Sequence, residues 1–100
     1  MAEDKVACRT PAEGRSGVTN IPRWKFDAVR AAILEALQRA GPDGLAFSEL
    51  SGAVGQQLDP AVLARLGSVG WHSTTVKLEL EVRGEIVRLP GKGPQRLVLS

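Results

Sequence analysis

Residues 69–89 read VGWHSTTVKLELEVRGEIVRL, and the hydrophobic period of the chain changes at Gly84 within this stretch. Before Gly84, apolar residues recur at helical spacings over residues 69–83. Glycine is a common stop for a helix because it adopts the left-handed conformation readily. After it, the runs 85–89 and 95–99 are rich in β-forming residues, with Pro and Gly in the loop 90–94 between them. The stretch therefore predicts a helix followed by a β-hairpin.

Three helical segments are predicted upstream of this helix. The first has Pro22 at its first position and ends at residues 41–42, where Gly-Pro breaks the hydrogen-bond ladder. The second opens at residues 45–50, and a short third is capped by Asp59, with Pro60 at its first position. The apolar residues that define the first two are Phe26, Val29, Ile33, Leu37 and Ala40, then Phe47, Leu50, Val54 and Leu58.

This order predicts an α+β fold, a winged helix-turn-helix with three to four helices followed by a C-terminal β-hairpin wing. A length of 100 residues fits one domain. We place that domain at residues 18–100, with a short extended segment at 18–21. Residues 1–17 are mostly small and polar, with Pro and Gly, and we expect them to form a flexible N-terminal arm.

Two segments resemble known proteins. Residues 80–86, LEVRGEI, resemble the junction between helix and wing in many bacterial winged-helix regulators. Residues 70–84, GWHSTTVKLELEVRG, resemble the central motif of an uncharacterised family of small bacterial winged-helix-like proteins. In that family a Pro-x-Arg segment closes the chain, as residues 94–96 do here. The resemblance covers roughly residues 20–100 and implies the winged fold, but it brings no activity.

Composition excludes several classes of protein. A hydrophobic fraction of 43% with 24% charged residues is that of an ordinary globular protein, and a net charge of +2 is too small for a protein that coats a polyanion. Cys8 has no second cysteine to pair with, and with His72 alone it provides no zinc site. No signal peptide or membrane-length apolar run is present, so we expect a cytoplasmic protein. No spacing places a nucleophile beside a base, and we expect neither enzyme activity nor a metal or cofactor.

The last helix is apolar on two sides, which predicts that it is covered on both. Six residues fall on nearly opposite stripes, with Val69, Val76 and Leu80 on one and Trp71, Leu78 and Val82 on the other. We expect the first stripe to pack on the preceding helices. The second is to be covered by the hairpin, by residues 60–66 or by another subunit.

The predicted wing and last helix suggest binding to double-stranded DNA, as in a transcriptional regulator. Phosphate contacts supply most nonspecific affinity, and hydroxyls in a first helical turn can hold a phosphate, although they also cap helices. The candidate nucleic-acid-binding residues are Ser73, Thr74, Lys77, Arg88, Lys92 and Arg96. Two carboxylates in the last helix, Glu79 and Glu81, would repel phosphates. The wing cations have a second explanation, since charges on a hairpin discourage edge-to-edge pairing.

The alternative hypothesis is a protein–protein interaction module, or a homodimerising adaptor, that binds no nucleic acid. Its interface would be the second apolar stripe of the last helix, Trp71, Leu78 and Val82. Winged helices also serve as protein adaptors, and a fold alone does not choose between the two functions. Both hypotheses are therefore carried to the structure.

Overall fold

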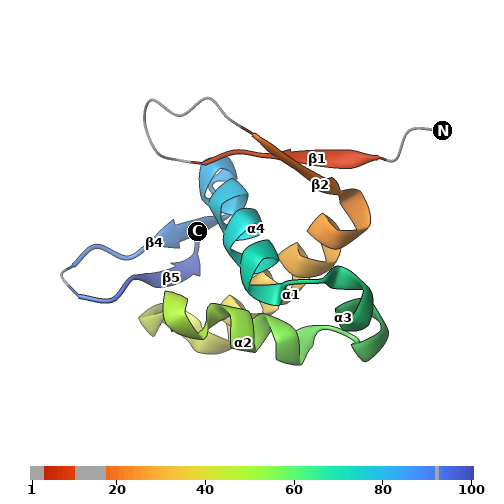
Figure 1. Cartoon of the computed structure of the whole chain (residues 1–100). Helices are drawn as coiled ribbons and strands as arrows, with labels where there is room; N and C mark the ends of the chain where they lie inside the picture. The colour runs from red at the N-terminus through yellow and green to blue at the C-terminus, as the bar shows by residue number, and fades with distance from the viewer. Residues whose placement is uncertain (1–3, 11–17, 92) are drawn as a thin grey trace.

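The computed structural model describes residues 4–10, 18–91 and 93–100 as an α+β protein with two small antiparallel sheets (Figure 1). In chain order the elements are β1 (Lys5–Cys8), β2 (Thr19–Pro22), α1 (Arg23–Ala40), the 3-10 turn η1 (Gly41–Asp43), β3 (Leu45–Ala46), α2 (Phe47–Gln57), α3 (Pro60–Leu66), α4 (Val69–Arg83), β4 (Ile86–Arg88) and β5 (Arg96–Leu99). The predicted fold class is confirmed, and four helices followed by a hairpin are compatible with a winged helix.

Helix boundaries follow local chemistry that the sequence displays. The Asp59 side chain accepts the Ala61 N–H at 2.8 Å and caps α3, as predicted. Helix α4 has the predicted bounds and is capped by Ser68, whose Oγ accepts the Trp71 N–H at 3.0 Å. Gly84 ends α4 in the left-handed conformation, with φ 77°. Pro22 lies just before α1 rather than at its first position.

The second helix begins two residues later than predicted. Leu45 and Ala46 form β3, which pairs with β5 and gives the sheet order β3–β5–β4. The preceding Gly44 has φ 78°, and a Cβ there would lie 2.8 Å from the Leu97 carbonyl oxygen, so no other residue fits. The partner strand of β3 lies about fifty residues further along the chain. Local periodicity therefore does not reveal this short strand.

The expectation of a flexible arm over residues 1–17 is wrong for residues 5–8. They form β1, which pairs with β2 in a hairpin whose register sets Val6 opposite Ile21. Val6, Cys8 and Ile21 are buried because alternate residues of the hairpin face the helices. The Arg23 N–H also donates to the Asp4 carbonyl oxygen at 2.9 Å. Residues 1–3 and 11–17 lie outside the described residues, and the expected segment at 18–21 overlaps β2.

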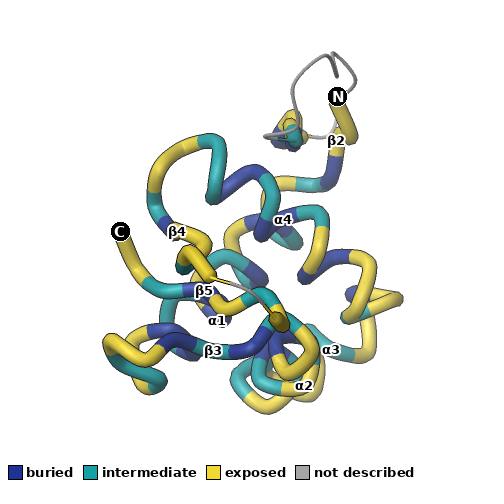
Figure 2. Tube along the Cα trace, turned by 90° about the vertical axis from the view of Figure 1, so that its left-hand side faces the viewer, coloured by how far each residue is buried: buried dark blue, intermediate teal, exposed yellow. Residues whose placement is uncertain are grey.

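Helix α4 is the central element of the core. It contacts α1, α2, β1 and β4, and buried stretches lie along it (Figure 2). Its Val76 and Leu80 are fully buried. The predicted apolar stripe of α1 is buried from Phe26 to Leu37, and in α2 Leu50 and Val54 are buried. The first stripe of α4 therefore packs on the preceding helices as expected. Within the described ranges, no helix has both the length and the apolar composition to span a bilayer.

Leu80→Ala should lower the free energy of unfolding by about 2–5 kcal/mol, because it leaves a cavity at a position that is 0% exposed. The matched control is Leu99→Ala, at a position that is 40% exposed, where a change of less than about 0.5 kcal/mol is expected. Urea denaturation followed by far-UV circular dichroism measures both. Equal losses in the two variants would contradict the central place of α4.

Candidate interaction surface on helix α4

The solvent side of α4 is uncharged. Packing of Val76 and Leu80 inward turns the opposite side of the helix outward. That side carries Trp71, Thr74, Leu78 and Val82, which we call the α4 face. Trp71 is 48% exposed, Thr74 is exposed, and Leu78 and Val82 are half-buried. The α4 face lies between two hairpins, since β1 and β4 both contact the helix (Figure 1).

Lys77, one of the candidate nucleic-acid-binding residues, lies inside the molecule. Its side chain is 3% exposed, and its Nζ is 3.1 Å from Glu81 Oε2 and 4.8 Å from the centroid of the Phe47 ring. Burial lowers the pKa of Lys77, an effect that the hydrogen bond and charge of Glu81 partly oppose. The Lys77 ammonium group is therefore almost fully shielded from solvent in this structure.

Ser73 and Thr74 lie in the second turn of α4, not in the first turn as predicted. The helix begins at Val69, and Ser68 caps it, so Ser73 is not a capping residue either. Ser73 is 1% exposed, and its Oγ has no hydrogen-bond partner within the described part of the chain. Thr74 is exposed on the α4 face.

Two of the predicted wing cations, Arg88 and Arg96, make contacts within the protein. Arg88 Nε donates to Glu81 Oε1 at 3.3 Å, and Glu81 also pairs with Lys77. Arg96 donates to the carbonyl oxygens of Asp43 and Gly44, both at 3.0 Å, and so ties β5 to the turn before β3. Lys92 lies outside the described residues. The five candidate residues for nucleic acid that the structure describes thus do not form one basic surface.

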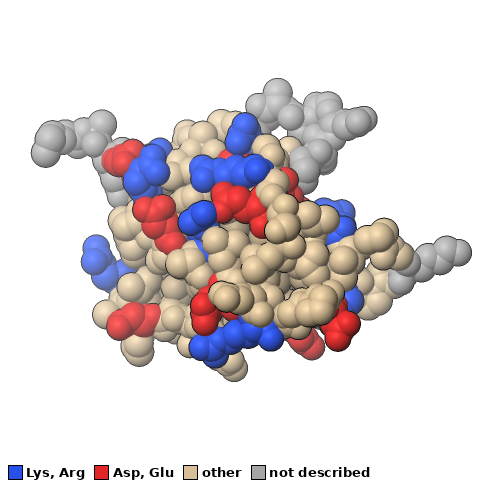
Figure 3. Space-filling model, turned by 180° about the vertical axis from the view of Figure 1, so that it is seen from behind, with Lys and Arg blue, Asp and Glu red and all other residues tan. Residues whose placement is uncertain are grey.

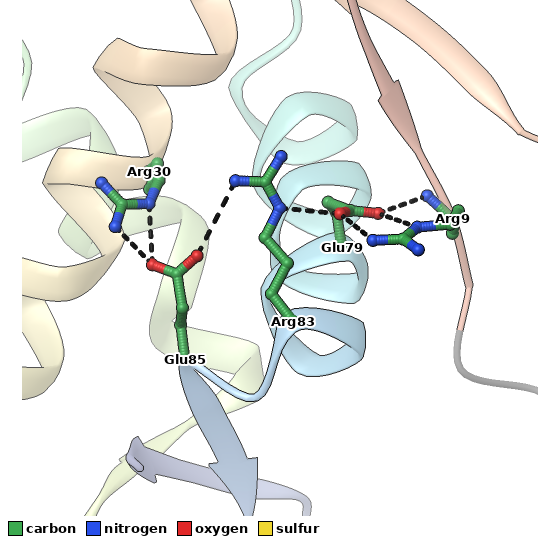
Figure 4. Close-up of polar contacts among 5 residues, drawn as sticks. All are labelled: Arg9, Arg30, Glu79, Arg83 and Glu85. Atoms are coloured by element: carbon green, nitrogen blue, oxygen red, sulfur yellow. Dashed lines mark hydrogen bonds and ion pairs between the residues drawn. The ribbon is translucent and has the colours of Figure 1, made fainter.

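A network of ion pairs, which sequence reasoning missed, fixes the side of α4 next to the N-terminal hairpin (Figure 4). Glu79 is buried and accepts from the Arg9 backbone N–H, Nε and Nη2 at 2.8, 3.0 and 2.8 Å, and from Arg83 Nε at 2.8 Å. Glu85 extends this network of ion pairs to α1. Its Oε2 lies 3.8 Å from Arg83 Nη1, and its Oε1 accepts a hydrogen bond from Arg30 Nε at 2.8 Å. The Glu79–Arg83 pair has the i,i+4 spacing of a helical ion pair and could have been read from the sequence. Arg9 is 70 residues from Glu79, so no spacing predicts that contact.

These hydrogen bonds hold the Glu79 carboxylate ionised. The hydrogen bonds from Arg9 lower the pKa of Glu79 to about 2, with Arg83 adding to the effect and burial opposing it. The adjacent Cys8 thiol shows the opposite shift, because burial and the Glu79 charge raise its pKa to about 11. A thiol with this pKa stays protonated at neutral pH and is a poor nucleophile.

Aromatic residues at the start of α4 and α1 pack against polar neighbours. The rings of Trp71 and His72 meet edge to face at 4.8 Å, and His72 Nδ1 donates to the Ser68 carbonyl oxygen at 2.7 Å. Trp24 lies against the cationic groups of Lys25 and Arg65, at 5.5 and 5.0 Å from its centroid. No group of His, Cys, Asp and Glu side chains among the described residues could hold a metal ion.

Charges of both signs alternate on the back of the molecule, where Lys and Arg lie beside Asp and Glu (Figure 3). Several cations of the protein are paired with acids, as Arg23 is with Asp4, Arg39 with Glu35 and Arg30 with Glu85. Such a surface creates no strong field of one sign over that face.

Residues 5–97 match the model of a protein family of unknown function, DUF6958. The chain belongs to this family. The matched range includes β1, Arg9 and Glu79, so the N-terminal hairpin lies within the family domain. No curated protein and no solved structure matches the chain.

The Glu79 network predicts a specific dependence of stability on pH. Because the pKa of Glu79 falls from 4.5 to about 2 on folding, its contribution is fully present above pH 4.5 and is lost as the pH falls toward 2. Glu79→Gln should lower the free energy of unfolding at neutral pH and should reduce the loss of stability between pH 4.5 and about 2. Urea denaturation at a series of pH values tests this.

Glu49→Gln is the matched control for this measurement, because Glu49 is exposed on α2. We expect this variant to lose stability at acidic pH as steeply as the wild type does. A Glu79→Gln variant that lost stability with acid as steeply as the wild type would contradict the assignment.

Proposed function

We propose that this protein is an interaction module that pairs with a second copy of itself through the α4 face. The observation that carries the proposal is the position of Trp71, Leu78 and Val82 on the solvent side of α4, with no charged side chain among them. Exposed aromatic residues contribute strongly to protein interfaces because they bury a large area at a low entropic cost.

The chemistry of the α4 face favours a second copy over a charged partner. In a two-fold interface the same surface meets itself, so any charge in its centre would face a like charge. The α4 face contains none. Ion pairs flank it on both sides, Arg9 with Glu79 and Arg88 with Glu81, which gives the apolar centre and polar rim common in interfaces.

A substitution in the middle of the α4 face tests the proposal. Leu78→Lys places two ammonium groups near the two-fold axis and should weaken the dimer at least tenfold, which is about 1.4 kcal/mol. Sedimentation equilibrium up to about 1 mM measures the dissociation constant. The matched control, Leu99→Lys, changes an exposed leucine on β5 and should leave association unchanged.

Two outcomes would contradict dimerisation through α4. One is a wild-type protein that remains monomeric over the whole concentration range. The other is a Leu78→Lys dimer as tight as that of the wild type, which would mean that the copies meet through another surface.

DNA binding is the second candidate, and one observation favours it. The element order and the β3–β5–β4 sheet are compatible with a winged helix, and the Arg88 side chain, although paired with Glu81, is half exposed. Such binding would be led by the wing, with Arg88, Lys92 and Arg96 contacting phosphates. The internal contacts of Arg88 and Arg96 and the uncharged α4 face are why we rank it second.

A titration with a short DNA duplex at low salt tests this second function. Three phosphate contacts predict an affinity that falls roughly 40-fold between 50 and 200 mM salt. We expect amide signals of residues 88–96 to shift if the wing binds. The absence of shifts both there and in residues 72–77 would exclude it, and a matched titration with sodium chloride controls for ionic strength.

A further inference from the structure

A small cavity lies where α2 and α4 pack together. Its volume is about 200 Å³, below the range of about 300–1,000 Å³ that holds drug-sized ligands. Ser48 and Ser51 of α2 and Gly70, Ser73 and Thr74 of α4 line it. Ser48, Gly70 and Thr74 are exposed residues, so the cavity opens to solvent. Its size fits one small polar group.

The lining provides hydrogen-bond donors and no carboxylate. Four of its residues carry hydroxyls, each of which can donate one hydrogen bond: Ser48, Ser51, Ser73 and Thr74. Phe47 and Leu50 complete the wall with apolar surface. Glu49, the acid in the first turn of α2, is exposed and does not line the cavity.

Ser73 provides the observation that points to a ligand. It is 1% exposed, and its Oγ has no hydrogen-bond partner among the residues that the structure describes. A buried hydroxyl without a partner destabilises a fold, and native proteins retain few such groups. Alanine at this helical position would avoid that cost. The presence of a hydroxyl at Ser73 is explained if a bound group supplies the missing hydrogen-bond acceptor.

The electrostatics of the cavity favour an anion. Phe47 and Ser48 are the first residues of the 11-residue helix α2. The Phe47 N–H donates to the Gln95 carbonyl oxygen at 2.8 Å, and the N-cap, Ala46, has no side-chain oxygen to accept the other N–H groups of the first turn. Lys77 lies one turn beyond Ser73 on α4, with its Nζ 4.8 Å from the centroid of the Phe47 ring that lines the cavity. Both features place positive potential at the cavity, although Glu81 offsets part of that from Lys77.

We infer that the cavity between α2 and α4 binds one phosphate group through the hydroxyls of Ser48, Ser51, Ser73 and Thr74. The group is either a free phosphate ion or a phosphodiester of a DNA backbone, since both present the same tetrahedral oxygens. The inference does not depend on dimerisation, because the α4 face and the cavity share only Thr74.

A pair of variants at Gly70 tests this inference by charge alone. No atom lies within 4 Å of the position that a Cβ would take at Gly70, so a side chain is accommodated there. Gly70→Asp adds a carboxylate beside the cavity, and Gly70→Asn adds a neutral side chain of the same shape. Asp in the first turn also favours α4. Gly70→Asp should therefore fold and lose binding, whereas Gly70→Asn should keep it.

A second pair of variants concerns the hydroxyl of Ser73. Ser73→Ala should raise the urea midpoint of the ligand-free protein, because it removes an unpartnered buried hydroxyl, and should weaken binding at least tenfold. Thr75→Val removes a hydroxyl from α4 that does not line the cavity and should change neither the affinity nor its salt dependence. A gain in stability together with a loss of binding is not expected of a merely structural serine.

Titration of the ¹⁵N-labelled full chain has two arms, inorganic phosphate and a short DNA duplex, each at constant ionic strength against sodium chloride. Shifts at residues 48, 51, 70, 73 and 74 with phosphate alone support a free-anion site, and the same shifts with duplex alone support a phosphodiester site. Shifts in neither arm overturn the inference. So does binding that Gly70→Asp and Ser73→Ala leave unchanged.

Discussion

The burial of Val76 and Leu80 against α1 and α2 is the contact on which the rest of the structure depends. A helix can rotate about its axis, and these two side chains fix that rotation for α4. Once they point inward, Glu79 faces the N-terminal hairpin and Glu81 faces the wing. The remaining side of the helix faces solvent, which is how an uncharged face arises on a helix that contains four charged residues.

Charge in this protein serves mainly to join elements. Arg9 and Glu79 attach β1 to α4, Arg30 and Glu85 attach α1 to the start of the wing, and Arg96 holds the turn before β3. Cations used in this way are less available to a polyanion, because binding would break contacts that stabilise the fold. For this reason the α4 face and the small cavity beside it, rather than a basic surface, carry the functional proposals.

The prediction was most accurate where the determinants are local. Helix α4 and its stop at Gly84, the cap of α3 at Asp59 and the C-terminal hairpin all follow from periodicity, side-chain oxygens and glycine conformation within a few residues. It failed for β3, whose partner strand is about fifty residues away, and for β1, which pairs with the next strand, β2, but has only four residues in which to show an alternating pattern. It also assigned Lys77 to the surface, because a wheel of α4 does not show that Phe47 and the wing cover that side.

By itself, then, the sequence determined the helices, the hairpin and the two apolar stripes of α4, since hydrogen-bonding period and side-chain polarity act over a turn or a strand. Only the tertiary structure decided which stripe is buried and that Trp71 and Leu78 lie on the solvent side. It also decided that Ser73 lines a cavity and has no hydrogen-bond partner among the described residues. These properties depend on which distant elements cover each side of a helix. That is set by the packing of the whole core and not by any local pattern.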